Sequence, residues 1–103
     1  MIAPIMISFV IPARNESKYI ANTLETIFSL MNDDYAYEII VVDNASTDNT
    51  VGVAQQLKSV TVISLDSQVP ISKARNLGVA SSRGDVLVFL DADILITESW
   101  VNG

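Results

Sequence analysis

Four runs of apolar, largely β-branched residues alternate with three stretches in which apolar residues recur at helical spacing. The runs predict buried β-strands and the periodic stretches predict amphipathic helices. Strands that are apolar on both faces are typical of a parallel sheet covered by helices. The predicted strands are Ile5–Ile11, Tyr37–Val42, Val60–Leu65 and Val86–Leu90. The predicted helices run from about Lys18 to Met31, from the polar cluster at 43–50 to about Lys58, and from Ile71 to a C-cap near Gly84.

Strand and helix alternate along the chain with short connections, which predicts right-handed crossovers in one parallel sheet. In a half-Rossmann layout the first three strands step outward and the fourth returns beside the first. We therefore expect a three-layer α/β/α domain with strand order 3-2-1-4. Pro12 is expected to end the first strand because it cannot donate a backbone hydrogen bond. Residues 32–34 predict a turn, and Trp100 is expected in the core.

Polar residues follow three of the predicted strands at the edge where such sheets bind ligands, outside the carboxyl ends of the strands. Asn15 and Glu16 follow the first strand, Asp43 ends the second, and Asp91 and Asp93 follow the fourth. Residues two apart in an extended chain point to the same side, so the last two carboxylates can face one cation. Such a pair suits Mg²⁺ or Mn²⁺, particularly an ion that also binds phosphate oxygens. Taken alone, an Asp-x-Asp pair is better explained as an acidic turn, and only the residues that precede it in this chain favour a cation site.

The polar cluster after the second strand allows two interpretations. Asp43 can accept a hydrogen bond from a ribose hydroxyl or a base N–H. It can equally cap the following helix or form an Asx turn, and the sequence does not choose between these roles. Ser46, Thr47 and Asp48 are better explained as capping residues, because they stand where a helix begins.

The third predicted helix carries basic residues that can face a diphosphate. Lys73 and Arg75 both lie on it, and solvated surface charge is the alternative for each. Arg75 is the stronger candidate, because Asn76 and Gly78 beside it suggest a closely approached backbone. The glycines at 78 and 84 match neither a dinucleotide fingerprint nor a phosphate-binding P-loop, so phosphate would be held largely by a metal ion.

Composition narrows the chemistry. The 103 residues are 50% hydrophobic and carry 12 acidic against 6 basic side chains, a net charge of −6, which disfavours a nucleic-acid ligand. Cysteine and histidine are absent, so metal or acid–base chemistry must use carboxylates, lysine, tyrosine or hydroxyl groups. No apolar run approaches the roughly 20 residues of a membrane helix, and no signal peptide is evident. We expect one small cytoplasmic domain, which in a longer protein can be membrane-associated.

Four segments, in this order and spacing, resemble the family 2 glycosyltransferases, which are inverting enzymes with the GT-A fold. Four co-ordered motifs are far more specific than any one of them. The resemblance implies transfer of a sugar from a UDP- or GDP-sugar to an acceptor hydroxyl, assisted by Mg²⁺ or Mn²⁺. The segments are Ser8–Glu16, Ile40–Thr50, Ala74–Gly78 and Phe89–Asp93.

The resemblance also implies a role for individual residues in binding the donor. The segment matching 12–16 contacts the nucleoside, and the position matching Asp43 binds the base. Asp93 would be the main metal ligand, with Asp91 on the ribose or a metal-bound water and Arg75 near the base or diphosphate. Arg14 stands where many members carry an aromatic residue, so no contact is assigned to its side chain. The donor-binding residues are Pro12, Ala13, Asn15, Glu16, Asp43, Arg75, Asp91 and Asp93.

In that family the catalytic base lies well downstream of the Asp-x-Asp pair, in an acceptor-binding half. We therefore expect residues 1–103 to be a truncated donor-binding half that binds nucleotide weakly without turnover, and we assign no catalytic residue. Two copies can pair through the exposed sheet edge that the missing half would cover. The alternatives are a non-catalytic nucleotide- or metal-binding module and a sugar-nucleotidyltransferase-like domain. The latter normally has a glycine-rich loop after the first strand, whereas 12–16 contains no glycine.

Overall fold

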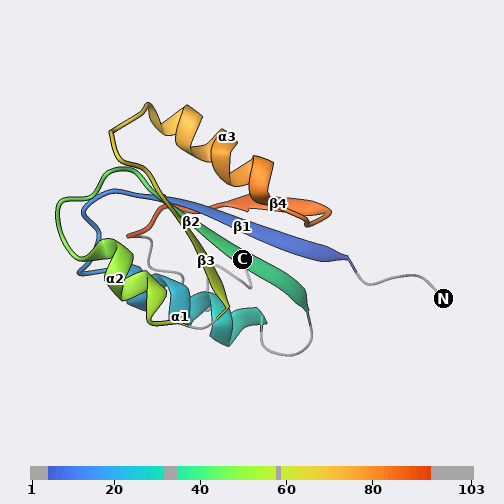
Figure 1. Ribbon diagram of the computed structural model, residues 1–103. Coiled ribbons are helices and arrows are strands. Elements are labelled where there is room, and N and C mark those ends of the chain that lie inside the picture. Colours follow the sequence, from blue (N-terminus) through green and yellow to red (C-terminus); the bar gives the residue numbers. More distant parts are fainter. Residues whose placement is uncertain (1–4, 32–34, 58, 94–103) are drawn as a thin grey trace.

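The fold is a single parallel sheet with helices on both sides. The computed structural model describes residues 5–31, 35–57 and 59–93. Helices α1 and α2 cover one face of the sheet and α3 covers the other (Figure 1). The predicted three-layer α/β/α architecture and strand order 3-2-1-4 are confirmed. The strands are β1 (Met6–Ala13), β2 (Ala36–Asp43), β3 (Val60–Ser64) and β4 (Val86–Phe89), and the helices are α1 (Ile20–Met31), α2 (Thr50–Gln55) and α3 (Ile71–Ser81).

Several element ends differ from the predictions by a few residues. Helix α1 begins at Ile20 instead of Lys18, and α2 ends at Gln55, three residues early. The predicted turn at 32–34 and Trp100 lie outside the described residues. Among the residues that are described, no helix is long and apolar enough to cross a membrane.

The core is built around the two central strands. Alternate side chains of β1 and β2 point to opposite faces, because a strand has a period of two. On one face Phe9 and Ile11 pack with residues of α1, and on the other Ile40 and Val42 pack with Ala74 of α3. All five side chains are buried, as expected for a parallel sheet covered on both sides. Both strands are therefore held rigidly by packing, and they fix the positions of the loops that follow their carboxyl ends.

Strand β4 does not match the prediction of a strand buried on both faces. Among the described residues it pairs only with β1, so it forms an open edge of the sheet that they build. Its side chains Val86, Leu87 and Phe89 are 44%, 39% and 45% exposed. Apolar sequence predicted burial here, but the strand order places β4 where the described residues cover little of it. Pairing of two copies through this edge stays a prediction.

Pro12 does not end the first strand, which continues through Ala13. The backbone groups of successive residues in a strand point to alternate sides. The Val10 carbonyl accepts from Leu90 N on the β4 side, whereas the Ala13 carbonyl accepts from Asn44 N on the β2 side. Pro12 therefore has its missing N–H on the β4 side, beyond the last residue that β4 pairs with. The prediction was wrong because it treated the whole length of β1 as central.

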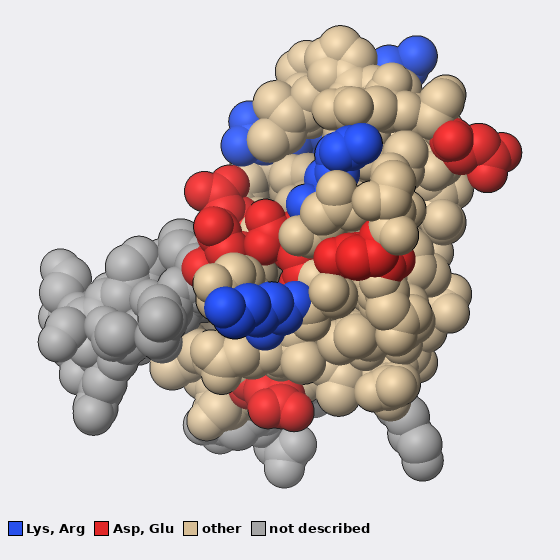
Figure 2. All heavy atoms as spheres, turned by 90° about the vertical axis from the view of Figure 1, so that its left-hand side faces the viewer, with Lys and Arg blue, Asp and Glu red and all other residues tan. Residues whose placement is uncertain are grey.

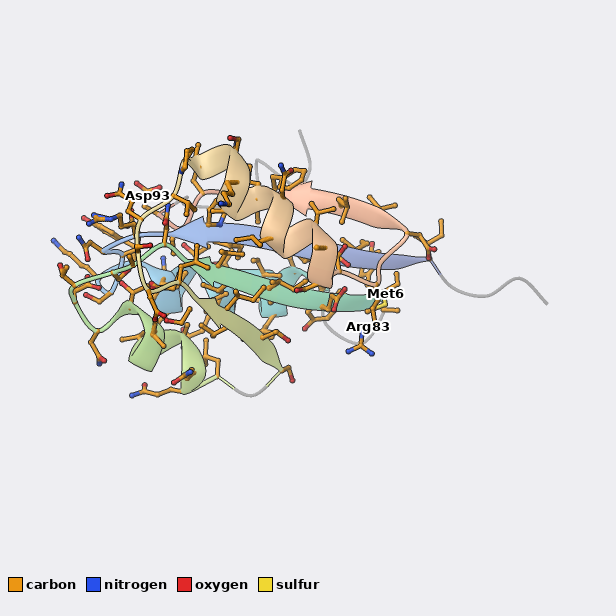
Figure 3. The ribbon with its side chains drawn as sticks, turned by 45° about the horizontal axis from the view of Figure 1, so that its top comes forward. Met6, Arg83 and Asp93 are labelled. Atoms are coloured by element: carbon orange, nitrogen blue, oxygen red, sulfur yellow. The ribbon has the colours of Figure 1, made fainter. Side chains whose placement is uncertain are left out.

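A polar network joins the turn between α3 and β4 to strands β1 and β2. It lies at the end of the sheet where β1 begins, and Figure 3 labels Met6 and Arg83 there. The buried Ser8 hydroxyl donates to Glu38 Oε2 at 2.6 Å and accepts from Gly84 N at 2.8 Å. The Arg83 N–H also donates to Glu38 Oε2, at 2.6 Å. Burial by itself would raise the pKa of Glu38, but the hydrogen bonds from Ser8 and Arg83 hold it below its ordinary value. The network anchors β4 far from the acidic edge.

The prediction that α3 has its C-cap near Gly84 was wrong, because the C-cap of α3 is Ser82. Gly84 belongs instead to this network. A Cβ on Gly84 would lie 2.3 Å from Ser8 Oγ and 2.7 Å from Ser8 N. The glycine is therefore required for close approach of the turn to β1.

Gly78 allows α3 to lie directly on the two central strands. A Cβ at this position would come within 2.4 Å of Val10 Cγ1 and 3.1 Å of Val42 Cγ2. Both valines are fully buried, so neither has space to move away. The close backbone approach suggested by the sequence is thus real, but its partner is the sheet.

We predict that Gly78→Ala lowers the free energy of unfolding by about 1–3 kcal/mol, because the extra methyl group overpacks the contact with the sheet. Gly52→Ala in α2 is the matched control, because its Cβ would meet only the Asn49 side chain, which can rotate away. The control should change stability by less than about 1 kcal/mol and in the stabilising direction, since alanine favours helix. Urea unfolding followed by circular dichroism measures both, and equal effects would contradict the prediction.

Candidate functional site

The loops that follow β1, β2 and β4 meet at the carboxyl end of the sheet, where Figure 3 shows Asp93. Figure 2 looks onto this edge and shows carboxylates gathered on it, with lysine or arginine side chains nearby. Burial raises the pKa of Glu16, and the negative charges of Asp93, Asp48 and Asp91 raise it further. Three different loops therefore bring four carboxylates into one electrostatic cluster.

The amide side chain of Asn15 links the first loop to the second. Its Oδ1 accepts from Thr47 N at 2.7 Å, Thr47 Oγ1 at 3.2 Å and Asp48 N at 3.3 Å. Asn15 has a left-handed backbone with φ of 55°, which asparagine tolerates better than most residues. The structure thus shows a structural use of this side chain, while its predicted contact with the nucleoside stays a prediction.

The second loop satisfies two further donors of the first. Glu16 N donates to Thr50 Oγ1 at 2.9 Å, and Ser17 N donates to Asp48 Oδ2 at 3.2 Å. Asp48 Oδ1 in turn accepts from Thr50 N at 3.0 Å and from the Thr50 hydroxyl. The Thr50 hydroxyl and the N–H donors of Ser17 and Thr50 lower the pKa of Asp48 to about 2. Asp48 is therefore held as a carboxylate that joins the two loops.

Asp43 ends β2 with its carboxylate almost enclosed, at 2% exposure. Its Oδ1 accepts from Ser46 Oγ at 2.6 Å and its Oδ2 from Ser46 N at 3.1 Å. The Ser46 hydroxyl also accepts from Asn15 N at 2.8 Å. The prediction that Ser46 caps α2 was wrong, because the N-cap of that helix is Asn49. The sequence offered only a cluster of capping residue types, in which individual partners could not be assigned.

Asn44 is a second residue whose role the sequence did not indicate. Its side chain donates to the Val69 carbonyl at 2.8 Å and accepts from Val69 N at 2.9 Å. These two bonds join the loop after β2 to the loop after β3. A carboxamide carries both a donor and an acceptor, which is the only sequence feature that could have suggested this bridge.

Asp91 and Asp93 are exposed, whereas Leu90 and Ala92 beside them are buried. Residues 92–93 form a turn and do not continue the extended strand. Both carboxylates are open to solvent, and the expectation that they face one cation stays a prediction. The Ala92 carbonyl accepts from Thr23 Oγ1 of α1 at 2.7 Å, which fixes the segment. Within the described ranges no group of three or more acidic, histidine or cysteine side chains is arranged to hold a metal ion. A cation at this pair would therefore need further oxygen ligands from a bound molecule or water.

The remaining predicted residues lie around this cluster. Pro12 and Ala13 are buried in β1, so any contact with a nucleoside would have to involve the exposed loop that follows them. Arg75 is half-buried in α3, and its Nε is buried without a hydrogen-bond partner among the described residues. Lys73 on the same helix is exposed. A buried donor without a partner requires an explanation, and a ligand is one.

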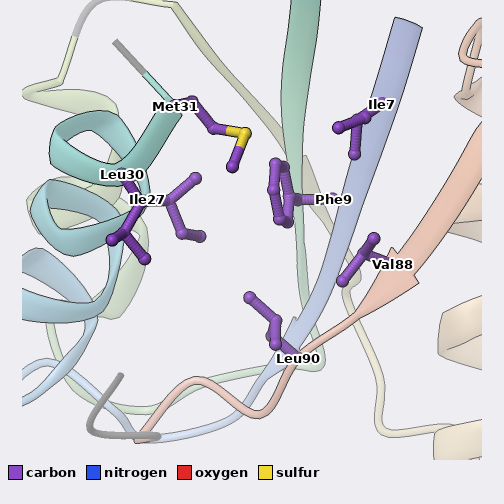
Figure 4. A pocket seen from close by; sticks show the side chains of 7 residues that line it. All are labelled: Ile7, Phe9, Ile27, Leu30, Met31, Val88 and Leu90. Atoms are coloured by element: carbon purple, nitrogen blue, oxygen red, sulfur yellow. The ribbon is translucent and has the colours of Figure 1, made fainter. Parts of the chain in front are cut away.

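An apolar pocket of about 150 Å³ lies between α1 and the strands β1 and β4 (Figure 4). Its lining carries no charged side chain, so it does not suit a phosphate-bearing ligand. The lining residues are Ile7, Phe9, Ile27, Leu30, Met31, Val88 and Leu90.

A half-Rossmann sheet with an acidic edge at its switch point defines an α/β ligand-binding domain. The chain belongs to glycosyl transferase family 2, whose sequence model matches residues 8–103. It is 33% identical to glycosyltransferase AglE of Haloferax volcanii, over 92% of this chain and 33% of that protein. The predicted family is confirmed.

Two solved structures share the fold. The mannosyltransferase PcManGT from Pyrobaculum calidifontis, in complex with GDP-Man and Mn²⁺, matches with a TM-score of 0.78 and 25% identity over 89% of this chain and 30% of that one. Glucosyl-3-phosphoglycerate synthase from Mycobacterium tuberculosis, in complex with Mn²⁺, UDP and glucosyl-3-phosphoglycerate, matches with a TM-score of 0.67 and 33% identity over 88% of this chain and 34% of that one. The chain spans about a third of the length of these relatives.

We predict that Asp48 stabilises the fold in a pH-dependent way. Its pKa is about 2 in the folded protein, against an ordinary value of 3.8, so its contribution is fully present above the ordinary value and is lost as the pH falls through about 2. The stability advantage of wild type over Asp48→Asn should shrink as the pH falls from about 4 toward 2. Chemical denaturation at a series of pH values tests this, and a difference that grows on acidification would contradict it.

Proposed function

We propose that this chain is the donor-binding half of a glycosyltransferase that uses a UDP- or GDP-sugar and a divalent cation. The observation that carries the proposal is the exposed pair Asp91 and Asp93 beside Glu16, at the switch point of a family 2 fold. Its cytoplasmic location stays a prediction.

Asp93 and Asp91 would hold Mg²⁺ or Mn²⁺. Two carboxylates supply few ligands, and Mg²⁺ is commonly bound by one or two carboxylates together with substrate phosphates and water. The cation and the nucleotide diphosphate would therefore bind together. Burial makes the largest contribution to the raised pKa of Glu16, and the charges of Asp93, Asp48 and Asp91 raise it further. A bound cation would relieve this second contribution. When bound, the metal would act as a Lewis acid on the departing diphosphate.

The chain's own residues would orient the nucleotide. The Asp43 carboxylate would accept a hydrogen bond from a base N–H, since its oxygens retain lone pairs beyond those that Ser46 occupies. The buried Arg75 Nε would donate to a diphosphate oxygen. The loop that begins with Pro12 and Ala13 and carries Asn15 and Glu16 would border the nucleoside.

In the proposed reaction an acceptor hydroxyl attacks the anomeric carbon, and the bond to the nucleotide diphosphate breaks with inversion. A carboxylate should take the acceptor proton. No residue of this chain is assigned that role, so the chain alone should bind nucleotide without transferring sugar. Sugar transfer by the 103-residue chain would contradict the proposal that it binds the donor without supplying the catalytic base.

We predict that the chain binds UDP or GDP only in the presence of Mn²⁺, and that Asp93→Asn weakens this binding at least about tenfold. The reason is the loss of a charged metal ligand, since changing even the partners of metal ligands typically weakens metal binding about 10–100-fold. Isothermal titration calorimetry of both nucleotides, with and without Mn²⁺, measures the effect.

Asp66→Asn is the matched control for this experiment. It removes the same charge from an exposed position after β3, at the opposite side of the sheet from β4. Binding by this variant should equal that of the wild type. Absence of binding by the wild type at millimolar nucleotide and Mn²⁺ would overturn the proposed function.

A further inference from the structure

We propose that Ser46 is a positioning residue, which orients the Asp43 carboxylate toward the nucleotide base and thereby sets the preference for a base that carries an N–H donor. The inference rests on the proposed function, because it assumes that a nucleotide binds at this edge. It goes beyond that function by assigning base selectivity to a residue that need not touch the ligand.

Ser46 holds both oxygens of the carboxylate. Its hydroxyl donates to Asp43 Oδ1 at 2.6 Å and its backbone N–H donates to Oδ2 at 3.1 Å. The terminal torsion of an aspartate is broad, so a carboxylate without such donors can rotate. Two donors from one residue, one to each oxygen, remove that freedom.

The orientation of the Ser46 hydroxyl is itself determined by the first loop. Asn15 N donates to Ser46 Oγ at 2.8 Å. A serine hydroxyl has one proton, and because Asn15 occupies a lone pair the proton is directed to Asp43. The loop that would border the nucleoside and the carboxylate that would meet the base are therefore linked through one oxygen atom.

Burial makes this orientation consequential. Asp43 is only 2% exposed, and Ser46 gives each of its carboxylate oxygens one donor. Water therefore supplies few further donors, and a base N–H would take a lone pair that Ser46 leaves open. In a poorly hydrated site a correctly aligned hydrogen bond is stronger, and a misaligned one leaves polar groups unpaired. A small rotation of the carboxylate should therefore change which bases are accepted.

The test compares each nucleotide with an analogue that lacks the donor. UDP is paired with N3-methyl-UDP, and GDP with N1-methyl-GDP, and the affinity ratio of each pair is measured with Mn²⁺ by calorimetry. Wild type should prefer the unmethylated form of the nucleotide that it binds. Ser46→Ala should reduce this ratio by about tenfold. The reason is that a misoriented Asp43 carboxylate would lose its charge-assisted hydrogen bond to the base N–H.

Thr47→Ala is the matched control. It removes a hydroxyl from the same loop, but that hydroxyl donates to Asn15 Oδ1 at 3.2 Å and makes no recorded hydrogen bond to Asp43. The ratio should stay at the wild-type value in this variant. Ser46→Thr, which keeps the hydroxyl, should retain most of the ratio.

The outcomes separate the inference from the function on which it rests. If Ser46→Ala binds both members of a pair more weakly by the same factor, or binds as the wild type does, Ser46 is not a positioning residue although the function stands. If the wild type binds neither nucleotide, the proposed function fails. If the alanine variant unfolds, Ser46→Cys takes its place, because cysteine keeps the side-chain volume but is only a weak donor. The proposal then requires the same loss of the affinity ratio in Ser46→Cys.

Discussion

The hydrogen bonds between the loops after β1 and β2 are the constraint on which the acidic edge depends. Carboxylates of like charge repel one another, so they stay close only where other interactions hold their backbones together. Side chains of Asn15, Asp48 and Thr50 accept hydrogen bonds from backbone N–H groups of the opposite loop. The two loops therefore behave as one unit, which is mounted on the buried strands β1 and β2. Under the proposed function, this arrangement would fix the site before a nucleotide binds and so lower the ordering cost of binding.

The acids of this edge fall into two groups by their hydrogen bonding. Asp48 receives donors from Ser17 and Thr50, and its pKa is lowered. The pKa of Glu16 is raised by burial and by its acidic neighbours. Asp48 holds the two loops together, whereas Glu16 adds to the negative charge that a cation would neutralise under the proposed function. The same field would make a bound metal ion stabilise the folded protein, because the ion binds the assembled site and not the unfolded chain.

The distribution of apolar surface gives the sheet two different sides. Strands β1 and β2 are enclosed by helices, whereas β4 leaves Val86, Leu87 and Phe89 partly exposed next to an apolar pocket. An open apolar edge favours association with further polypeptide. The relatives of this chain are about three times as long, so such polypeptide is available in the family. The acidic edge and the apolar edge meet at residues 90–93, where a buried leucine is followed by the metal-binding candidates.

The sequence by itself determined the elements, their order and the edge at which the acids would gather. Apolar runs and helical periodicity suffice for this, because parallel strands with short helical connections permit few topologies. It also named Asp91 and Asp93 as acids that follow the last strand, and both are exposed in the structure. Only the tertiary structure decided that Asn15 joins Ser46 and Thr47 of the second loop, because these partners lie about 30 residues from it in sequence. It also decided that Ser46 donates to Asp43, since a cluster of capping residue types leaves the individual partners open. The exposure of β4 and the continuation of β1 through Pro12 also depend on the tertiary structure. Hydrophobicity indicates that a residue tends to be buried, but the order and pairing of the strands determine whether it is covered and which hydrogen bonds it needs.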